Sequence, residues 1–326
     1  MNLVDDLASR FSTLLGKRAV ERLDLLMGTV VTQKVYGRRA AAAASRVLGE
    51  LQRLERLLSA FLPETDVSRI NASAGLGPVD VSPETFEILE MALRISEMSQ
   101  GAFDVTTGPL TRLWSVTSDH PQVPPHEAIT AALELVGFRH VKLDRERRTC
   151  SLPMRGQAID LGGIAKGYAA DRAAQVYRGM GVRSALIDIG GNVYAVGARP
   201  DGQPWVAGVQ DPKGNRGDIV GTLKLKDASA VTSGGYERGF TADGAWYHHI
   251  IDARSGYCSR SDIAGVTVVA RDSMLADALS TAVFVLGTER GIRLLQEFRG
   301  VEAVVVKEDR SILITGGLKA LFSPAQ

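Results

Sequence analysis

The stretch SALIDIGGNVYAVG, residues 184–197, decides the fold class of this chain. Two short runs of mostly apolar residues, 184–189 and 192–197, are separated only by Gly190 and Gly191. A connection of two residues joins antiparallel strands, because parallel strands need a crossover of a dozen residues or more. The stretch therefore predicts an antiparallel hairpin.

Helical patterns alternate with further strand-like runs on both sides of this hairpin. Apolar residues recur at helical spacing over 39–61, and an apolar helix is expected over 273–286. Ser82 followed by Pro83 and Glu84 is typical of a helix start, with a capping hydroxyl and a proline in the first turn. We therefore predict an α+β fold with mixed or antiparallel sheets and packed helices, in a single compact unit that can comprise two lobes.

Length and charge limit the classes to which the chain can belong. Its 326 residues suffice for one large domain or two smaller ones. The 38 basic and 37 acidic side chains nearly cancel, which gives no electrostatic reason to expect nucleic acid as a partner. No run approaches 18 consecutive apolar residues, so we expect no transmembrane helix. Cys150 and Cys258 lie far apart and are expected to be ordinary thiols.

The N-terminal segment has its own pattern. Apolar side chains recur at helical spacing over 2–17, and we expect a helical extension over 1–24 before a main domain over 25–326. Asp5 and Asp6 stand where the apolar core of a signal peptide would lie. The sequence as written therefore predicts a cytoplasmic protein, and a periplasmic location is the alternative if a leader has been removed.

The segment IDLGGIAKGYAAD, residues 159–171, runs from a strand end through two glycines into a helix. Backbone N–H groups at a helix start attract phosphate, and Lys166 adds a positive charge there. The spacing matches neither a Walker loop nor a dinucleotide-binding fingerprint. A phosphate-binding turn and a simple strand-to-helix turn with a surface lysine both stay open at this point.

Two polar residues interrupt the apolar helix expected over 273–286. Asp277 and Thr281 are four residues apart, so they share one face of that helix. A buried carboxylate without a partner is costly, and carboxylate and hydroxyl oxygens suit a hard cation such as Mg²⁺. The pattern favours a cation site over a buried, hydrogen-bonded aspartate.

The run WYHHIIDARSG, residues 246–256, contains two of the five histidines of the chain. Neighbouring residues of a strand point to opposite faces, so His248 and His249 cannot share one role. Arg254 follows Asp252 closely and can pair with it or with a phosphate. The sequence of this run is compatible with a structural role and with a functional one.

Taken together, these segments resemble the FAD:protein FMN transferase family, often called ApbE. The resemblance extends from Met27 to about Gly287 and implies an ApbE-like, T-fold-related domain. Besides the segments above, it is carried by the strings Met27-Gly-Thr29, Val67-Ser-Arg-Ile-Asn71, Gly101-Ala-Phe-Asp-Val-Thr106 and Thr232-Ser-Gly-Gly-Tyr-Glu237.

The resemblance implies a reaction and the residues for it. The enzyme would transfer FMN from FAD to a threonine hydroxyl of an acceptor flavoprotein and release AMP, with Mg²⁺ as cofactor. It places Mg²⁺ on Asp277, Thr281 and a backbone carbonyl near Gly163. His249 is the candidate acid/base, since an imidazole can accept the threonine proton. Asp252 is the alternative base, or the group that orients His249.

The same resemblance assigns contacts to FAD and a motif to the acceptor. We expect the acceptor loop to be of the Asp/Ser-Gly-x-Ser/Thr-Thr type. An FAD pyrophosphatase, in which water replaces the threonine, is the nearest alternative, and a non-catalytic FAD-binding protein is another. The expected FAD contacts are Met27 and Phe103 at the isoalloxazine, Lys166 at the pyrophosphate, Thr232, Tyr236 and Glu237 at the adenosine half, Ile250 beside His249, and Asp104 and Asp171 as anchors.

Overall fold

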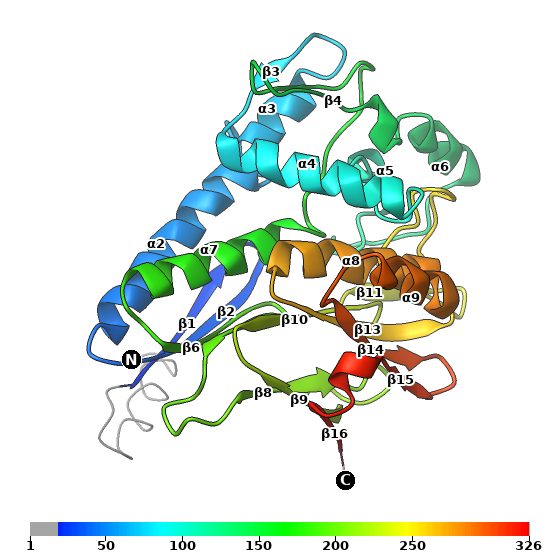
Figure 1. Cartoon of the computed structure of the whole chain (residues 1–326). Coiled ribbons are helices and arrows are strands. Elements are labelled where there is room, and N and C mark those ends of the chain that lie inside the picture. Colours follow the sequence, from blue (N-terminus) through cyan, green and yellow to red (C-terminus); the bar gives the residue numbers. More distant parts are fainter. Residues whose placement is uncertain (1–18, 326) are drawn as a thin grey trace.

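An eight-stranded sheet runs through the centre of the molecule (Figure 1). The computed structural model describes residues 19–325. Neighbouring strands of the sheet are antiparallel throughout, in the order β1-β2-β6-β7-β10-β13-β14-β15. The bounds are β1 Ala19–Leu26, β2 Thr29–Tyr36, β6 Ser184–Ile189, β7 Asn192–Gly197, β10 Ala228–Gly234, β13 Ile263–Ala270, β14 Glu302–Lys307 and β15 Ile312–Ile314.

The predicted hairpin of residues 184–197 forms as β6 and β7, with Ser184 opposite Gly197 and Ile189 opposite Asn192. Gly190 lies in the turn at a φ of 58°, which an L side chain rarely adopts. A Cβ atom there would stand 2.1 Å from Oγ1 of Thr29, the first residue of β2. Glycine therefore allows this turn to lie directly against the β1–β2 turn.

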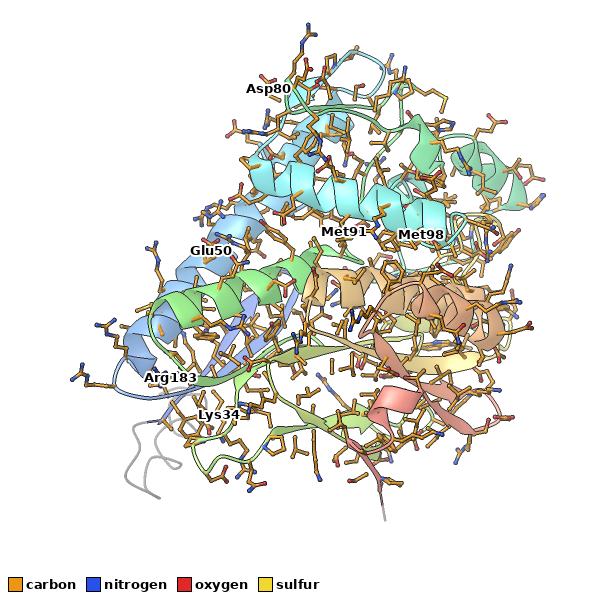
Figure 2. The ribbon with its side chains drawn as sticks, viewed as in Figure 1. Lys34, Glu50, Asp80, Met91, Met98 and Arg183 are labelled. Atoms are coloured by element: carbon orange, nitrogen blue, oxygen red, sulfur yellow. The ribbon has the colours of Figure 1, made fainter. Side chains whose placement is uncertain are left out.

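Helices cover one face of the sheet (Figure 1). Next to the strands lie α2 (Ala40–Leu58), α7 (Ala165–Gly179) and α8 (Ser273–Leu286), and α4 (Pro83–Met98) lies outside α7 and α8. Met91 of α4 projects toward this inner layer, and Glu50 of α2 faces α7, where it pairs with Arg172 at 3.3 Å (Figure 2). Most of the buried apolar side chains lie between these helices and the sheet.

A second, smaller sheet covers part of the other face. Its strands run in the order β16-β9-β8 and enclose a separate apolar cluster that includes Trp205 and Phe322. Every residue of β13 is buried, because this central strand is covered on both sides. The bounds here are β8 Trp205–Gln210, β9 Ile219–Leu225, β16 Phe322–Pro324 and the short helices α9 Thr288–Gln296 and η2 Gly316–Leu318.

The remaining elements form a cap beyond α4 and a hairpin near α8. Trp114 anchors this cap, since its Nε1–H donates to the carbonyl oxygen of Gly256 at 2.8 Å. The bounds are α3 Asp66–Ala72, β3 Val79–Asp80, α5 Gly108–Trp114, α6 His126–Leu133, η1 Phe138–His140, β4 Lys142–Asp144, β5 Thr149–Ser151, β11 Gly239–Ala242 and β12 Ala245–His248.

The structure confirms the α+β prediction and corrects some boundaries. Residues 19–24, expected at the end of a helical extension, form most of β1 and pair with β2; residues 1–18 lie outside the described part. The apolar and aromatic residues of 246–252 favour a strand over that whole stretch, but the strand β12 ends at His248. Within residues 19–325 no helix is long and apolar enough to cross a membrane.

Candidate functional site

The start of α7 packs directly on α8, and this contact assembles the candidate site. The N–H of Gly167 donates to Oδ2 of Asp277 at 2.9 Å. A Cβ atom on Gly167 would lie 2.2 Å from the carbonyl oxygen of Ser273, so only glycine fits between the two helices. The contact brings Nζ of Lys166 to 3.9 Å from Oδ1 of Asp277.

Gly163 and Thr281 complete this group. A Cβ atom on Gly163 would lie 3.3 Å from Oγ1 of Thr281, so the turn before α7 and the middle of α8 are in contact. Oγ1 of Thr281 is also 3.5 Å from Oγ of Ser233, at the end of β10. The structure thus brings together the three predicted cation ligands, Gly163, Asp277 and Thr281.

The donor atoms of this group fit a hard cation. Asp277 is 3% exposed, and within residues 19–325 its Oδ1 makes no hydrogen bond and only the long ion pair with Lys166. The described residues contain no group of three or more His, Cys, Asp or Glu side chains placed to hold a metal ion. A cation here would therefore take one carboxylate, one hydroxyl and backbone oxygens, a set that suits Mg²⁺ with its retained waters and phosphate ligands.

Phe103 and Asp104 support the turn around Gly163 from behind. The Phe103 ring is buried, and its Cε2 would be 3.1 Å from a Cβ on Gly163. Asp104 accepts hydrogen bonds from the N–H of Thr106 at 2.7 Å and from the N–H of Phe138 at 2.8 Å. Burial raises the pKa of the Asp104 carboxyl, and these donors oppose that shift. Asp104 is thus an anchor of the surrounding loop.

Asp171 anchors the helix that carries the cation ligands. Its carboxylate accepts from the N–H of Ser273 at 2.9 Å and the N–H of Met274 at 2.8 Å, at the first turn of α8. Burial, with a contribution from Asp272, raises the pKa of Asp171 to about 7. The two carboxylate oxygens bind free N–H groups of a helix start, so Asp171 fixes α8 relative to α7.

His249 lies just past the end of β12. Its Nδ1 is 3.3 Å from the carbonyl oxygen of Arg238, which leaves Nε2 as the nitrogen available for a proton. The His249 side chain is exposed to solvent. Desolvation by the neighbouring protein nevertheless lowers its pKa to about 4. The charges of Arg238 and Lys166 act in the same direction. The ring is therefore neutral at pH 7.

Asp252 is engaged elsewhere. Its carboxylate receives two hydrogen bonds from the Arg254 guanidinium, at 2.8 and 2.7 Å. Its carbonyl oxygen accepts from the N–H of Gly256 at 2.8 Å, which closes the turn. Among the described residues no hydrogen bond joins Asp252 to His249. The structure therefore places Asp252 in the turn that follows His249 rather than on its ring.

Met27 lies in the β1–β2 turn, at the edge of the same region. Its N–H donates to the Glu55 carboxylate at 2.7 Å, and its φ is 53°. The next carbonyl, of Gly28, accepts from Nη2 of Arg238 at 3.1 Å. The carbonyl oxygen of the same Arg238 lies near Nδ1 of His249. Arg238 therefore contacts both the turn that carries Met27 and the segment that carries His249.

The remaining predicted residues divide between the sheet, the surface and a cavity. Oγ1 of Thr232 hydrogen-bonds Oγ1 of Thr267 at 2.8 Å, inside the sheet. Glu237 lies exposed on the surface. Ile250 is buried, and its N–H donates to Nδ1 of His248 at 3.2 Å. Tyr236 lines a cavity of about 530 Å³ together with His248.

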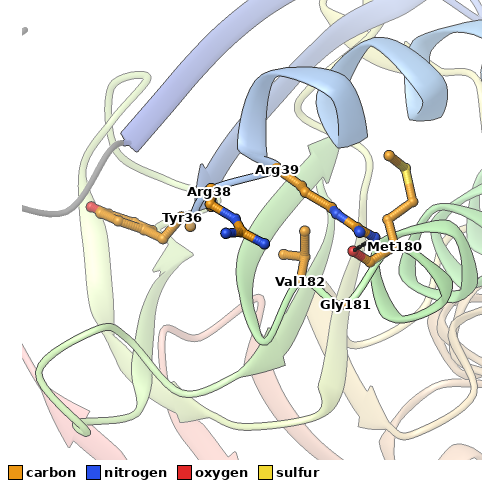
Figure 3. A pocket seen from close by; sticks show the side chains of 7 residues that line it. Tyr36, Arg38, Arg39, Met180, Gly181 and Val182 are labelled. Carbon is orange, nitrogen blue, oxygen red and sulfur yellow. Dashed lines mark hydrogen bonds between the residues drawn. The ribbon is translucent and has the colours of Figure 1, made fainter.

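A second hollow, of about 250 Å³, holds none of the predicted site residues (Figure 3). It lies where β2 ends and α2 begins, with Arg38 and Arg39 beside Val182. Arg39 donates to the carbonyl oxygen of Met180 at 3.5 Å. The predicted cation ligands lie elsewhere, so this hollow is not part of the candidate site.

Sequence reasoning missed two polar residues of the site. Ser233 hydrogen-bonds Ser280 at 2.8 Å and lies beside Thr281. Asp160 accepts from the N–H of Gly162 at 2.8 Å and shapes the glycine turn before α7. Ser233 directly precedes the pair Gly234-Gly235, and Asp160 lies two residues before the pair Gly162-Gly163. A polar residue next to a glycine pair was the signal available for both.

Comparison with known families decides the assignment. A model described as the ApbE family matches residues 27–305. The chain belongs to the ApbE family. Two curated relatives, from Treponema pallidum and Klebsiella pneumoniae, are each named FAD:protein FMN transferase. The first is 37% identical over 92% of this chain and 88% of its own length. The second is 37% identical over 92% and 93%.

Solved structures agree with this assignment. The crystal structure of the ApbE protein from Thermotoga maritima superposes with a TM-score of 0.86 at 34% identity, over 93% of this chain and 99% of that one. The flavin transferase ApbE from Vibrio cholerae gives a TM-score of 0.85 at 26% identity, over 94% and 100%. The predicted family and fold are confirmed, and the chain is a transferase.

Proposed function

We propose that this protein transfers FMN from FAD to a threonine hydroxyl of an acceptor flavoprotein and releases AMP. The observation that carries the proposal is the meeting of Gly163, Asp277 and Thr281 beside Lys166. A buried carboxylate oxygen without a hydrogen bond, next to a lysine, suits a cation and a diphosphate bound side by side. The curated relatives carry the name of this reaction.

The cation assigned to this site is Mg²⁺, held by Asp277, Thr281 and the backbone carbonyl of Gly163. When bound, Mg²⁺ offsets the charge of a diphosphate and polarises its phosphoryl oxygens. The observation that supports this assignment is the hard-oxygen character of the three donors. Asp171 and Gly167 hold the helix that carries two of them in place.

The diphosphate of FAD is assigned to the start of α7. Nζ of Lys166 donates to the carbonyl oxygen of Gly162 at 2.9 Å, so its charge stays over the glycine turn. Free N–H groups at the same helix start add donors for phosphate oxygens. The flavin end of FAD is assigned toward the turn of Met27, which meets the segment of His249.

His249 is assigned as the group that takes the threonine proton on Nε2. The threonine oxygen forms a bond to the FMN phosphorus, and the bond from this phosphorus to the bridging oxygen breaks, so AMP leaves with that oxygen. A pKa of about 4 makes His249 a weak base in the free protein. A bound diphosphate anion offsets the charges of Lys166 and Arg238 and therefore raises this pKa toward neutrality.

The proposal is tested with FAD, Mg²⁺ and a small acceptor domain that carries an Asp-Gly-x-Thr-Thr loop. Acceptor mass is followed by mass spectrometry and AMP by chromatography. We expect the acceptor to gain FMN, and we expect Asp277→Asn or chelation of Mg²⁺ to abolish that gain. Asp309→Asn is the control, because it makes the same chemical change in an exposed turn.

The other outcomes identify the alternatives. AMP and free FMN with an unmodified acceptor would show an FAD pyrophosphatase. Bound FAD without any AMP would show a flavin-binding protein and would contradict the proposed transfer. If Asp277→Asn were as active as Asp309→Asn, the proposed reaction would stand, but the assignment of the cation to Asp277 would be contradicted.

A further inference from the structure

A cavity of about 530 Å³ lies next to the candidate site and is used by none of the steps above. His248 lines this cavity, whereas the adjacent His249 does not. Neighbouring residues of a strand point to opposite faces, which accounts for the difference. The aromatic lining consists of Tyr236, Trp246 and Phe284. A cavity of this size is comparable with the sites that hold small ligands or a few side chains of a peptide.

The walls of the cavity are fixed by hydrogen bonds. Nε1–H of Trp246 donates to the carbonyl oxygen of Gly235 at 2.8 Å. Nε2 of His248 lies 3.0 Å from the carbonyl oxygen of Ser259, and the imidazole meets Phe284 edge to face at 5.6 Å. Burial lowers the pKa of His248, so the ring is neutral and donates through Nε2. The walls are thus ordered and largely apolar.

One positive charge in the lining, that of Arg260, has no carboxylate partner among the described residues. Lys213 forms an ion pair with Glu308, so these two charges cancel. Arg260 makes no ion pair and no hydrogen bond with any residue in 19–325, and its guanidinium lies 5.8 Å from the Tyr247 ring centroid. With two cations and one carboxylate, the lining carries a net charge of +1 at pH 7. This charge complements a carboxylate.

The cavity and the candidate site share two elements, α8 and the segment after β10. Phe284 follows Thr281 by three residues on α8, so both lie on one face, about 5 Å apart along the helix. The segment after β10 likewise links the two places, since Ser233 lies beside Thr281 and Tyr236 lines the cavity. A peptide bound in the cavity therefore brings its neighbouring residues toward the cation ligands.

We infer that this cavity binds an acidic segment of the acceptor protein next to the residue that receives FMN. A carboxylate of that segment pairs with Arg260, and an apolar group lies against Trp246 and Phe284. The inference rests on the proposed function and adds to it the place where the acceptor docks. The sequence analysis instead expects Tyr236 to contact the adenosine half of FAD. In that case a nucleotide, and not a peptide, would occupy this cavity.

A binding measurement tests this without turnover. A fluorescein-labelled peptide with an Asp-Gly-x-Thr-Thr sequence is titrated with the full chain, and anisotropy is recorded. We expect Arg260→Glu to weaken binding on the order of tenfold or more, because attraction becomes repulsion, and Arg260→Lys to retain most of it. Arg299→Glu is the matched control, an exposed residue at the opposite end of the β13–β14 pair.

A charge swap and a competition complete the test. A peptide with Arg in place of its Asp should bind Arg260→Glu better than it binds the wild type, and FAD affinity should be equal in both proteins. Equal peptide binding by Arg260→Glu and Arg299→Glu, or displacement of the peptide by AMP, would overturn the inference. Failure of the proposed function would look different, because the peptide would then bind without FMN transfer. If FMN transfer occurs and Arg260→Glu does not affect it, only the docking site is contradicted.

Discussion

Replacing Gly167 by alanine tests how tightly the site depends on the contact between α7 and α8. Two effects of opposite sign compete. Alanine is better than glycine in a helix interior by about 1 kcal/mol. The added Cβ, however, would stand 2.2 Å from the carbonyl oxygen of Ser273 and 2.7 Å from Cβ of Asp277, and backbone at that distance must move.

The steric effect should prevail. Ordinary contact begins near 3.4 Å, so the helices must separate by roughly 1 Å, and overpacking of this kind costs about 1–3 kcal/mol. The separation also lengthens the 2.9 Å bond from Gly167 N–H to Asp277, and a lost hydrogen bond to a charged group costs about 1.5–3 kcal/mol. The net effect is a destabilisation of roughly 2–4 kcal/mol.

Gly179→Ala supplies the control, since it makes the same change in the last residue of the same helix, where a Cβ atom would meet nothing within 4 Å. Urea unfolding should show Gly167→Ala destabilised and Gly179→Ala unchanged or slightly more stable. FMN transfer should also fall in the first variant, because Asp277 moves. If both variants were equally stable, our account of the helix contact would be wrong.

Three further predictions concern titrating groups. His249→Gln should lower the transfer rate by about 10²–10⁴-fold while FAD binding persists. In the wild type, kcat/KM for FAD reports the free enzyme, so its acid limb should lie near pH 4 rather than near 6.5; an acid limb near 6.5 in that profile would contradict the desolvated ring. Asp252→Asn should cost less than about tenfold in rate, because its partner is Arg254; a loss as large as that of His249→Gln in the same assay would restore Asp252 as the orienting group. Asp171 binds its proton more tightly in the folded protein, with a pKa of about 7 against 3.8, so its favourable contribution is complete below pH 4 and is lost as pH rises through 7. Urea unfolding from pH 4 to 8 should therefore show wild-type stability falling relative to Asp171→Asn, and a constant difference would refute the shifted pKa.

Elements with strong local signals could be predicted from sequence to within a few residues. The hairpin of residues 184–197 and the helix over 273–286 have the predicted bounds, because the turn chemistry and the apolar pattern are both local. Residues 63–77 are mostly polar and predict a loop, but Asp66–Ala72 within them form the helix α3. Seven residues give too few turns to show a period, and its start depends on a cap by Thr65 at 2.9 Å.

The candidate site shows the same division between local and tertiary information. Asp277 and Thr281 could be paired from their spacing alone, since a helix brings i and i+4 together. The approach of Gly163 followed from the family resemblance and not from any spacing. The engagement of Asp252 by Arg254 was one of two options in the sequence, and only the folded turn shows which partner it takes.

The glycines of the run IDLGGIAKGYAAD have different tasks, which the sequence alone cannot separate. Gly167 is required by a neighbour 106 residues later in the chain, whose carbonyl oxygen fills the place of a Cβ. Gly163 leaves room for Thr281 and the Phe103 ring. Both therefore set how closely α8 approaches the start of α7, and this approach sets the 3.9 Å between Lys166 and Asp277. A lysine held at that distance by backbone contacts is too far for a hydrogen bond to Asp277, so its charge stays available to an anion bound at the helix start.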